Sequence, residues 1–170
     1  TLPAIALYNG LSQRGEKQVD DLHVVDMCAA PGGKTAQLCT YGFASVTAVE
    51  RSAKRSRRLE QNKERLNMDW EIIVADGTQW TSGDKTVAGI LVDAPCTATG
   101  TGSKRPDVLR KDPQYQDLLE EQYNLACHAA DNILQLDGML VYATCSLLKQ
   151  ESEHQVTKLL EREDGAKLET

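Results

Sequence analysis

Short apolar runs alternate along the chain with longer segments of mixed polarity, a pattern that predicts strands alternating with helices. The apolar runs are residues 22–27, 44–49, 70–75, 87–92 and 139–143. They are almost continuously apolar, which is typical of parallel strands that are buried on both faces. The helical segments follow the turn at Gly33 and cover residues 52–66, 113–133 and 151–163, where apolar residues recur at helical spacing. Residues 1–21 and 97–112 are predicted to be irregular.

This alternation predicts an α/β fold, a parallel sheet with helices on both faces. In such sheets, ligands bind beyond the carboxyl ends of the strands. The residues at the predicted strand ends are Asp26, Glu50, Asp76, Asp93 and Cys145. A solvated turn explains any one of these residues, but five charged or reactive residues at five strand ends predict a ligand site.

A glycine turn follows the first predicted strand at Pro31-Gly32-Gly33-Lys34-Thr35. It lacks the Walker A pattern of nucleotide triphosphatases, which needs glycine where this chain has Cys28, and it lacks the dinucleotide fingerprint G-x-G-x-x-G. Its backbone N–H groups are expected to face a ligand that bears a carboxylate. Glu50 is placed to accept hydrogen bonds from ribose hydroxyls, and Asp76 to accept one from an adenine amino group. This set suits an adenosine with an amino-acid tail, whereas a tight turn with solvated acids is the structural alternative.

Composition narrows the class of protein further. The 170 residues carry a net charge of −6, which argues against binding nucleic acid over the whole surface but leaves room for a local basic site. The five cysteines contain no C-x-x-C pair and have no zinc-module spacing, which favours reduced thiols in a cytoplasmic protein and no metal. No apolar run is long enough to span a bilayer, so we expect no membrane association.

Three motifs resemble those of the RNA 5-methylcytosine methyltransferase family. DMCAAPGGKT (residues 26–35) is similar to its cofactor motif, DAPCTATG (93–100) to its Pro-Cys motif and YATCS (142–146) to its Thr-Cys motif. The resemblance covers residues 22–163. Through KRPD (104–107) and KLET (167–170), the chain is most similar to the bacterial small-subunit ribosomal RNA enzymes of the RsmB/Sun type.

The resemblance implies a Rossmann-like class I methyltransferase sheet that binds S-adenosylmethionine. The residues expected to line the cofactor tail are Cys28, Ala29, Ala30, Pro31, Gly32, Gly33 and Lys34. Glu50 would hold the ribose, Asp76 the adenine, and Asp93 would lie between the cofactor and the target base. The family more often has aspartate where this chain has Glu50, although the longer carboxylate can still reach two hydroxyls.

By the same resemblance, Cys145 is the nucleophile that attacks carbon 6 of cytosine, and Cys96 assists product release. Asp93 would hold ring N3, because the added charge must be absorbed there. A thiol near pKa ~8.5 is mostly protonated at neutral pH, so we expect the site to lower the pKa of the nucleophile, with Lys34 as the nearest cation. DNA cytosine methyltransferases use the Pro-Cys cysteine instead, so an exchange of the two roles is the alternative.

RNA, and ribosomal RNA in particular, is the implied partner. The residues expected to contact its phosphates are Lys104, Arg105, Arg110 and Lys111, whereas the basic segment 51–58 is interpreted as a solvated helix face. Family members usually carry a separate RNA-binding domain before the catalytic one and further strands after the fifth. We therefore expect residues 1–170 to be a portion of the catalytic core. A cofactor-binding fragment without catalysis and a cysteine hydrolase are the alternative functions.

Overall fold

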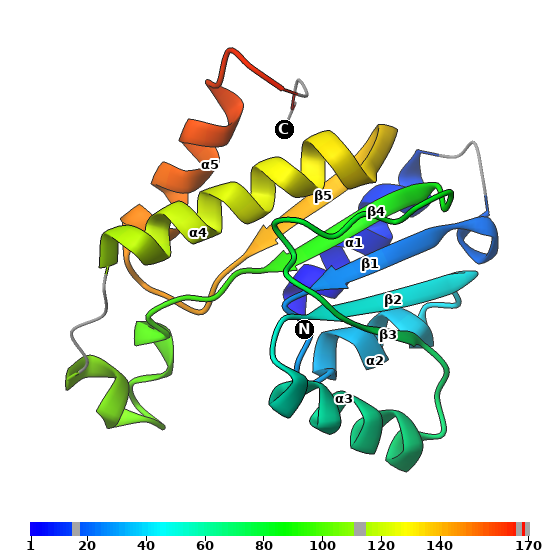
Figure 1. Ribbon diagram of the computed structural model, residues 1–170, viewed down its shortest axis with the longest axis horizontal. Helices are drawn as coiled ribbons and strands as arrows, with labels where there is room; N and C mark the ends of the chain where they lie inside the picture. Colours follow the sequence, from blue (N-terminus) through cyan, green and yellow to red (C-terminus); the bar gives the residue numbers. More distant parts are fainter. Residues whose placement is uncertain (15–17, 111–114, 166–167, 169–170) are drawn as a thin grey trace.

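A parallel five-stranded sheet of order β3-β2-β1-β4-β5 forms the centre of the molecule (Figure 1). The computed structural model describes residues 1–14, 18–110, 115–165 and 168. The strands are β1 (His23–Met27), β2 (Ser45–Glu50), β3 (Glu71–Val74), β4 (Val87–Asp93) and β5 (Leu134–Ala143). The predicted α/β class and all five predicted strands are confirmed.

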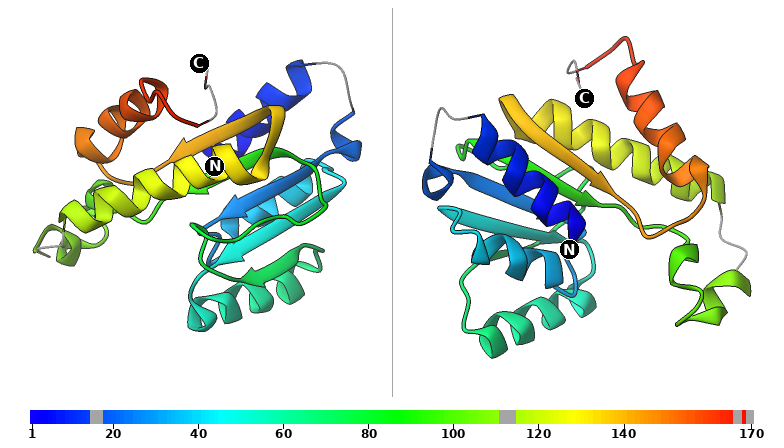
Figure 2. Two further views of the ribbon diagram at one scale, coloured as in Figure 1. Left: turned by 45° about the horizontal axis from the view of Figure 1, so that its top comes forward. Right: turned by 180° about the vertical axis from the view of Figure 1, so that it is seen from behind.

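Helices cover both faces of this sheet, as the continuous apolar strands predict. The helices are α1 (Leu2–Gln13), α2 (Gly33–Thr40), α3 (Ala53–Leu66), α4 (Tyr115–His128) and α5 (Glu153–Leu160). One apolar cluster joins α1, α2 and α3 to one face of the sheet, and a second joins α4 to the other face (Figure 2). Alternate residues of a strand therefore enter different clusters: Val24 packs toward α1 and α2, whereas Val25 packs toward α4.

Single turns of helix complete the described chain. They are the 3-10 turns η1 (Val19–Asp21), η2 (Thr99–Thr101), η3 (Pro106–Arg110) and η5 (Lys149–Glu151), and the π turn η4 (Ala129–Ile133). The segment 97–112 was predicted to be a loop, and it contains η2 and η3; residues 111 and 112 lie outside the described residues. Strand β5 begins earlier than predicted, but its regular pairing with β4 starts at Met139, after an irregularity in which Asp137 has a positive φ.

The prediction that residues 1–21 are irregular was wrong, because α1 occupies most of them. Pro3 lies in the first helical turn, where the missing N–H has no partner in any case. Gly10 does not break the helix; it faces Met139 of β5, whose side chain a Cβ at this position would overlap. Ala4, Leu7 and Leu11 are buried along the same helix face.

The strand order reverses beside β1, which has β2 on one side and β4 on the other. The connection from β1 runs through α2 to β2, and the chain later returns to place β4 against the opposite edge of β1. The loops that leave β1 and β4 consequently diverge, which opens space beyond their carboxyl ends. The candidate site lies there.

Candidate active site

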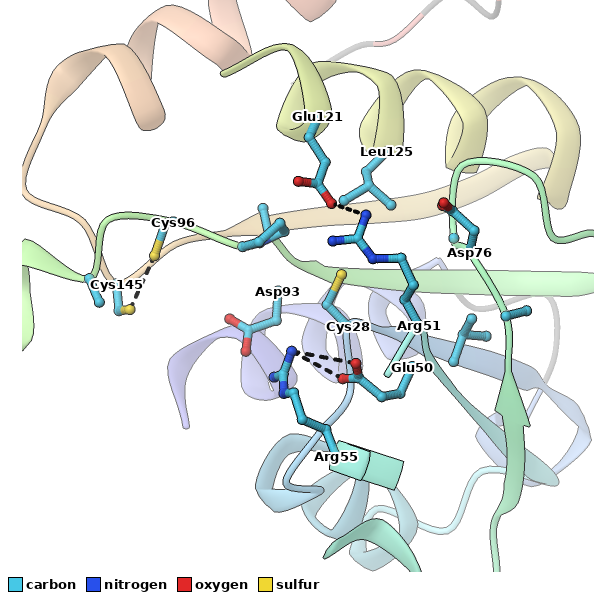
Figure 3. A pocket seen from close by; sticks show the side chains of 16 residues that line it. Cys28, Glu50, Arg51, Arg55, Asp76, Asp93, Cys96, Glu121, Leu125 and Cys145 are labelled. Carbon is cyan, nitrogen blue, oxygen red and sulfur yellow. Dashed lines mark hydrogen bonds and ion pairs between the residues drawn. The ribbon is translucent and has the colours of Figure 1, made fainter. Parts of the chain in front are cut away.

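A cavity of about 350 Å³ opens beyond the carboxyl ends of β1, β2 and β4 (Figure 3). Its lining includes the carboxylates of Glu50, Asp76, Asp93 and Glu121, the guanidinium groups of Arg51 and Arg55, and the thiols of Cys28, Cys96 and Cys145. Val49, Ala75 and Leu125 add an apolar part. Its volume lies in the range of small-molecule sites. The structure thus brings together the four predicted strand-end residues Glu50, Asp76, Asp93 and Cys145.

A hydrogen bond between side chains holds the glycine turn against the end of β1. The hydroxyl of Thr35 donates to the Asp26 carboxylate at 2.6 Å, and complete burial raises the pKa of Asp26 to about 7. Gly32 has a φ of +99°. Within the described part of the chain, Cys28 is the turn residue that lines the cavity, Ala29 and Ala30 are buried, and Pro31 and Gly33 are exposed. Contacts from residues 29–34 to a cofactor tail remain a prediction.

Glu50 joins β2 to this turn. Its carboxylate, 2% exposed, accepts the backbone N–H of Ala30 at 3.3 Å and that of Ser52 at 2.9 Å. The Arg55 guanidinium forms an ion pair with Glu50 at 3.3 Å and donates to the Ala30 carbonyl at 2.8 Å. Glu50 therefore organises the turn, and a contact from the same carboxylate to a ribose remains a prediction.

The basic segment 51–58 is only partly a solvated helix face. Lys54, Arg57 and Arg58 are exposed as expected. Arg55 instead pairs with Glu50, and Arg51 pairs with Glu121 of α4 at 2.7 Å, so that both arginines line the cavity. Sequence reasoning missed both ion pairs, because charge spacing along one helix does not reveal which acids lie on other elements.

Asp76 lies at the cavity after β3. One of its oxygens accepts the backbone N–H and the hydroxyl of Thr78, at 2.9 and 2.8 Å, and these hydrogen bonds lower the pKa of Asp76. The carboxylate is therefore charged near neutral pH and can accept a hydrogen bond from a ligand. Its predicted contact with an adenine amino group is untested.

Lys34 and Asp93, which lines the cavity, form an ion pair with Nζ 2.6 Å from Oδ2. Both side chains are partly exposed. Lys34 was expected to be the nearest cation to a reactive thiolate, but its ammonium is instead held by the Asp93 carboxylate. Lys34 and Asp93, both predicted to act in catalysis, thus contact each other, and the pair joins the start of α2 to the end of β4.

The Sγ atoms of Cys96 and Cys145 lie 3.2 Å apart (Figure 3). The Gly100 N–H donates to the Cys145 carbonyl at 2.9 Å, so the loops after β4 and β5 are also joined through their backbones. Partial burial of the thiol, its hydrogen bond with Cys96 and nearby negative charge raise the pKa of Cys145 to about 11, although the residue as a whole is exposed. The expectation that the site lowers this pKa was therefore wrong, because burial, the contact with Cys96 and the charge of Asp93 all raise it.

A buried polar cluster beneath these two loops was missed by sequence reasoning. Glu151 and Gln122 are both fully buried, and Gln122 donates to the Glu151 carboxylate at 2.9 Å. Their positions in helical segments gave no signal, since polar residues in such segments are usually solvated.

The segment 97–110, which includes Lys104, Arg105 and Arg110, projects away from the sheet beyond the end of β4 (Figure 1). Lys104 and Arg105 are exposed, and Arg105 is 3.4 Å from the carboxylate of Asp107. Arg110 ends η3, and Lys111 lies outside the described residues. Contact between these residues and RNA remains a prediction.

None of the helices among the described residues is long and apolar enough to cross a membrane. The same residues include no group of three or more His, Cys, Asp or Glu side chains that could hold a metal ion.

The sheet order, the glycine turn after β1 and the acids after β2 and β3 define the class, a Rossmann-like S-adenosylmethionine-dependent methyltransferase fold. Solved structures agree. NSun6 from Pyrococcus horikoshii, solved with the S-adenosylmethionine analogue SFG, is 30% identical with a TM-score of 0.74, over 93% of this chain and 40% of that one. A methyltransferase homolog from Pyrococcus horikoshii is 27% identical with a TM-score of 0.71, over 92% of this chain and 48% of that one.

Sequence comparison gives the family. Residues 16–170 match the family described as 16S rRNA methyltransferase RsmB/F, and the chain belongs to it. Ribosomal RNA small subunit methyltransferase B of Sodalis glossinidius is 41% identical over 81% of this chain, and that of Pseudomonas syringae is 41% identical over 85%. The chain spans about a third of the length of these relatives, 33% in both cases. The resemblance inferred from the three motifs is thereby confirmed.

The residues present fit S-adenosylmethionine, the cofactor of this class. The cavity carries carboxylates that complement a sulfonium and an ammonium group, together with hydrogen-bond acceptors for ribose hydroxyls. Val49, Ala75 and Leu125 provide an apolar surface suited to a purine ring. The donor and acceptor types therefore match the ligand inferred from the sequence.

Proposed function

We propose that this chain forms the catalytic core of an enzyme that methylates carbon 5 of a cytosine in small-subunit ribosomal RNA, through a covalent cysteine adduct. The observation that carries the proposal is the pair of thiols, Cys96 and Cys145, 3.2 Å apart at the edge of the cavity. Membership of the RsmB/F family supports the RNA substrate. A hydrolase would need a histidine beside one of these thiols, and none of the described residues that line the cavity is a histidine.

Cysteine chemistry answers a specific difficulty of this substrate. Carbon 5 of cytosine is a poor nucleophile, and a thiolate that adds to carbon 6 makes it reactive. In the proposed step, the Cys145 thiol gives its proton to the Asp93 carboxylate, which lines the same cavity. The sulfur then bonds to carbon 6, the electrons of the 5,6 double bond move toward carbon 5 and ring N3, and N3 takes up the proton from Asp93. S-adenosylmethionine would supply the electrophilic methyl group.

The other residues act on protons and on orientation. Once ring N3 carries the proton, it would donate a hydrogen bond to the Asp93 carboxylate, whose direction is fixed by the ion pair with Lys34. Solvent water, acting as the base, would take the carbon 5 proton; the electrons of that bond restore the 5,6 double bond, and the carbon 6–sulfur bond breaks with its electrons returning to Cys145. Cys96 would assist this release, and its contact with Cys145 is short enough for a proton to be shared between the two sulfurs. Glu50, Asp76 and the turn at residues 28–34 would hold the cofactor.

Access is the remaining requirement. Cys145 is exposed and Cys96 is partly exposed, so an extruded base can reach both sulfurs from the side of the loops. A cytosine within a duplex cannot do so, and the target is therefore single-stranded or flipped out of its stack.

The test is transfer of a tritiated methyl group to unmodified 16S ribosomal RNA, followed by mapping of the modified nucleotide. Cys145→Ala is expected to abolish transfer, whereas Cys96→Ala is expected to accumulate a covalent protein–RNA adduct. Cys39→Ala is the matched control, because Cys39 lies on α2 outside the cavity lining. Accumulation of the adduct in Cys145→Ala would reverse the two roles. Stoichiometric cofactor binding without transfer to any RNA would instead favour the cofactor-binding fragment.

A further inference from the structure

The carboxylate of Glu151 is buried directly beneath the two cysteine loops. It is 0% exposed, and it accepts hydrogen bonds from the Thr97 backbone N–H at 2.9 Å, the Thr97 hydroxyl at 2.5 Å and the Gln122 amide at 2.9 Å. Among the described residues, no lysine, arginine or histidine forms an ion pair with it. A buried charge without a cation must be compensated by hydrogen bonds, so these donors are bound firmly.

Burial by itself would raise the pKa of Glu151, but the hydrogen bonds from Ser146, Thr97 and Gln122 outweigh it and lower this pKa. The group is therefore an anion at neutral pH. All of its side-chain partners donate hydrogen bonds to it, so both carboxylate oxygens act as acceptors. A neutral amide in the same place could accept only at its oxygen, because its NH₂ group is a donor.

These donors flank Cys96 on both sides. Thr97 follows Cys96 in the chain, and its N–H is held by Glu151. Pro95 precedes Cys96, and its carbonyl accepts a hydrogen bond from the Gln122 amide at 2.8 Å. The peptide groups on either side of the cysteine are thus fixed to α4 and η5, which leaves the side-chain torsion as the main freedom of the thiol.

The same cluster reaches Cys145 through hydroxyl groups. The Thr97 hydroxyl lies 3.1 Å from the hydroxyl of Ser146, the residue after Cys145. The Ser146 hydroxyl also lies 3.1 Å from that of Thr99, which accepts the N–H of Leu147 at 2.9 Å. Both cysteine loops are therefore attached to one carboxylate through neighbouring residues.

We propose that Glu151 is a positioning residue that sets the separation and orientation of the Cys96 and Cys145 thiols, acting through Thr97 and Ser146 with Gln122 as its support. The inference rests on the proposed function in one respect, that the two thiols act on the same base. The spacing itself is a property of the folded chain. The change that tests it is Glu151→Gln, which keeps the size of the side chain but turns an NH₂ group toward a donor.

Phenylarsine oxide measures the spacing without RNA or cofactor. Its arsenic binds two neighbouring thiols, forming two arsenic–sulfur bonds and releasing one water, and mass spectrometry of peptides locates the bridge. The wild-type chain is expected to be bridged between Cys96 and Cys145. Glu151→Gln is expected to weaken this bridging by about tenfold, since the effective concentration of one thiol near the other falls. Glu153→Gln is the matched control, because Glu153 is 68% exposed and pairs only with Lys149 among the described residues.

Methyl transfer supplies the second measurement. In Glu151→Gln, kcat is expected to fall about tenfold, with KM for RNA and for S-adenosylmethionine changed by less than about twofold, because binding groups are untouched. A general loss of structure would instead raise both KM values and lower the melting temperature in proportion. Thr97→Val removes one hydrogen bond to Glu151 at nearly constant side-chain volume, and it is expected to weaken bridging about threefold. If Glu151→Gln fails to fold, this second variant tests the positioning role of Glu151.

The outcomes separate the two proposals. A wild-type chain that is bridged by the arsenical but transfers no methyl group contradicts the proposed function, and the comparison of variants still decides the role of Glu151. Wild-type bridging in a folded Glu151→Gln, or in Thr97→Val where the first variant does not fold, overturns the positioning role. Absence of bridging in the wild-type chain also overturns it, since the thiols would then not share the spacing on which the inference depends.

Discussion

Cys96 and Cys145 are separated by 49 positions in the chain, yet their sulfur atoms lie 3.2 Å apart. The cause is the register of the sheet. Asp93 pairs with Ala143 at the ends of β4 and β5, so the residues that follow each strand leave the sheet side by side. The Gly100 N–H then holds the Cys145 carbonyl, which keeps the two loops together beyond the last strand pair. Two motifs that are far apart in the sequence thereby form one site.

The closeness of the two thiols predicts that Cys96 controls the ionisation of Cys145. The pKa of Cys145 is raised to about 11 by burial and then by its hydrogen bond and charge interaction with Cys96. Cys96→Ala removes the second and third causes, so the pKa of Cys145 should fall and its thiolate fraction at pH 8 should rise severalfold, by about tenfold for each unit of the fall. The rate of alkylation of Cys145 by iodoacetamide between pH 7 and 10, followed by mass spectrometry, measures the thiolate fraction and hence the pKa. An unchanged profile would show that burial alone sets this pKa.

The strands of the sheet, and the edge of the sheet that carries the site, could be predicted from the sequence. Continuous apolar runs located β1 and β4, and the residues that followed them, Cys28 and Cys96, proved to line one cavity. Gly10 could not be interpreted from composition, because a glycine that permits close packing inside a helix looks the same as one that ends it.

The polar contacts of the site were the part that sequence could not give. Lys34 was assigned to a thiolate on grounds of motif proximity, yet its ammonium is held by Asp93. Glu151 lies in a predicted amphipathic segment where an acid would ordinarily face water, and only the packing of η5 against the β4 loop buries it. Such pairings depend on which elements meet in three dimensions, and a periodic pattern along one element does not contain that information.

Neighbouring glycines in the turn after β1 are expected to respond oppositely to alanine. Gly32 has a φ of +99°, and a Cβ there would lie 3.0 Å from Leu59, so Gly32→Ala should reduce the free energy of unfolding by about 1–3 kcal/mol. Gly33 begins α2, and a Cβ there would meet nothing within 4 Å, so Gly33→Ala should stabilise by about 0.4–1 kcal/mol. Urea denaturation of both variants checks the contrast. Equal losses in the two variants would contradict it.

The raised pKa of Asp26 predicts that the folded chain becomes less stable as the pH rises. Its pKa is raised from 3.8 to about 7 in the folded chain, mainly by burial, so the folded state holds a proton that the unfolded state has released between these values. The free energy of unfolding should therefore decrease with rising pH across this interval, by up to about 4 kcal/mol. Asp26→Asn should flatten the dependence, as measured by urea denaturation at pH 5 and pH 8.

Asp69→Asn is the control for this measurement, because the Asp69 side chain is 98% exposed and its solvation changes little on unfolding. The control is expected to keep the wild-type difference between pH 5 and pH 8. A wild-type difference that survives in Asp26→Asn would assign the pH dependence to another group.

The exposed basic side chains after the Pro-Cys motif predict how the affinity for RNA depends on salt concentration. Lys104 and Arg105 are exposed and belong to the segment that projects beyond β4 and carries the loop after the Pro-Cys motif. If each neutralises one phosphate of single-stranded RNA, Lys104→Ala and Arg105→Ala should each reduce the slope of log K against log salt by about 0.7. Filter binding of an unmodified 16S RNA fragment at several salt concentrations measures the slope. Lys54→Ala on α3 is the control, since Lys54 is equally exposed but lies on the face interpreted as solvated. A slope reduced by Lys54→Ala and unchanged by Lys104→Ala would move the RNA path from the η2–η3 segment to α3.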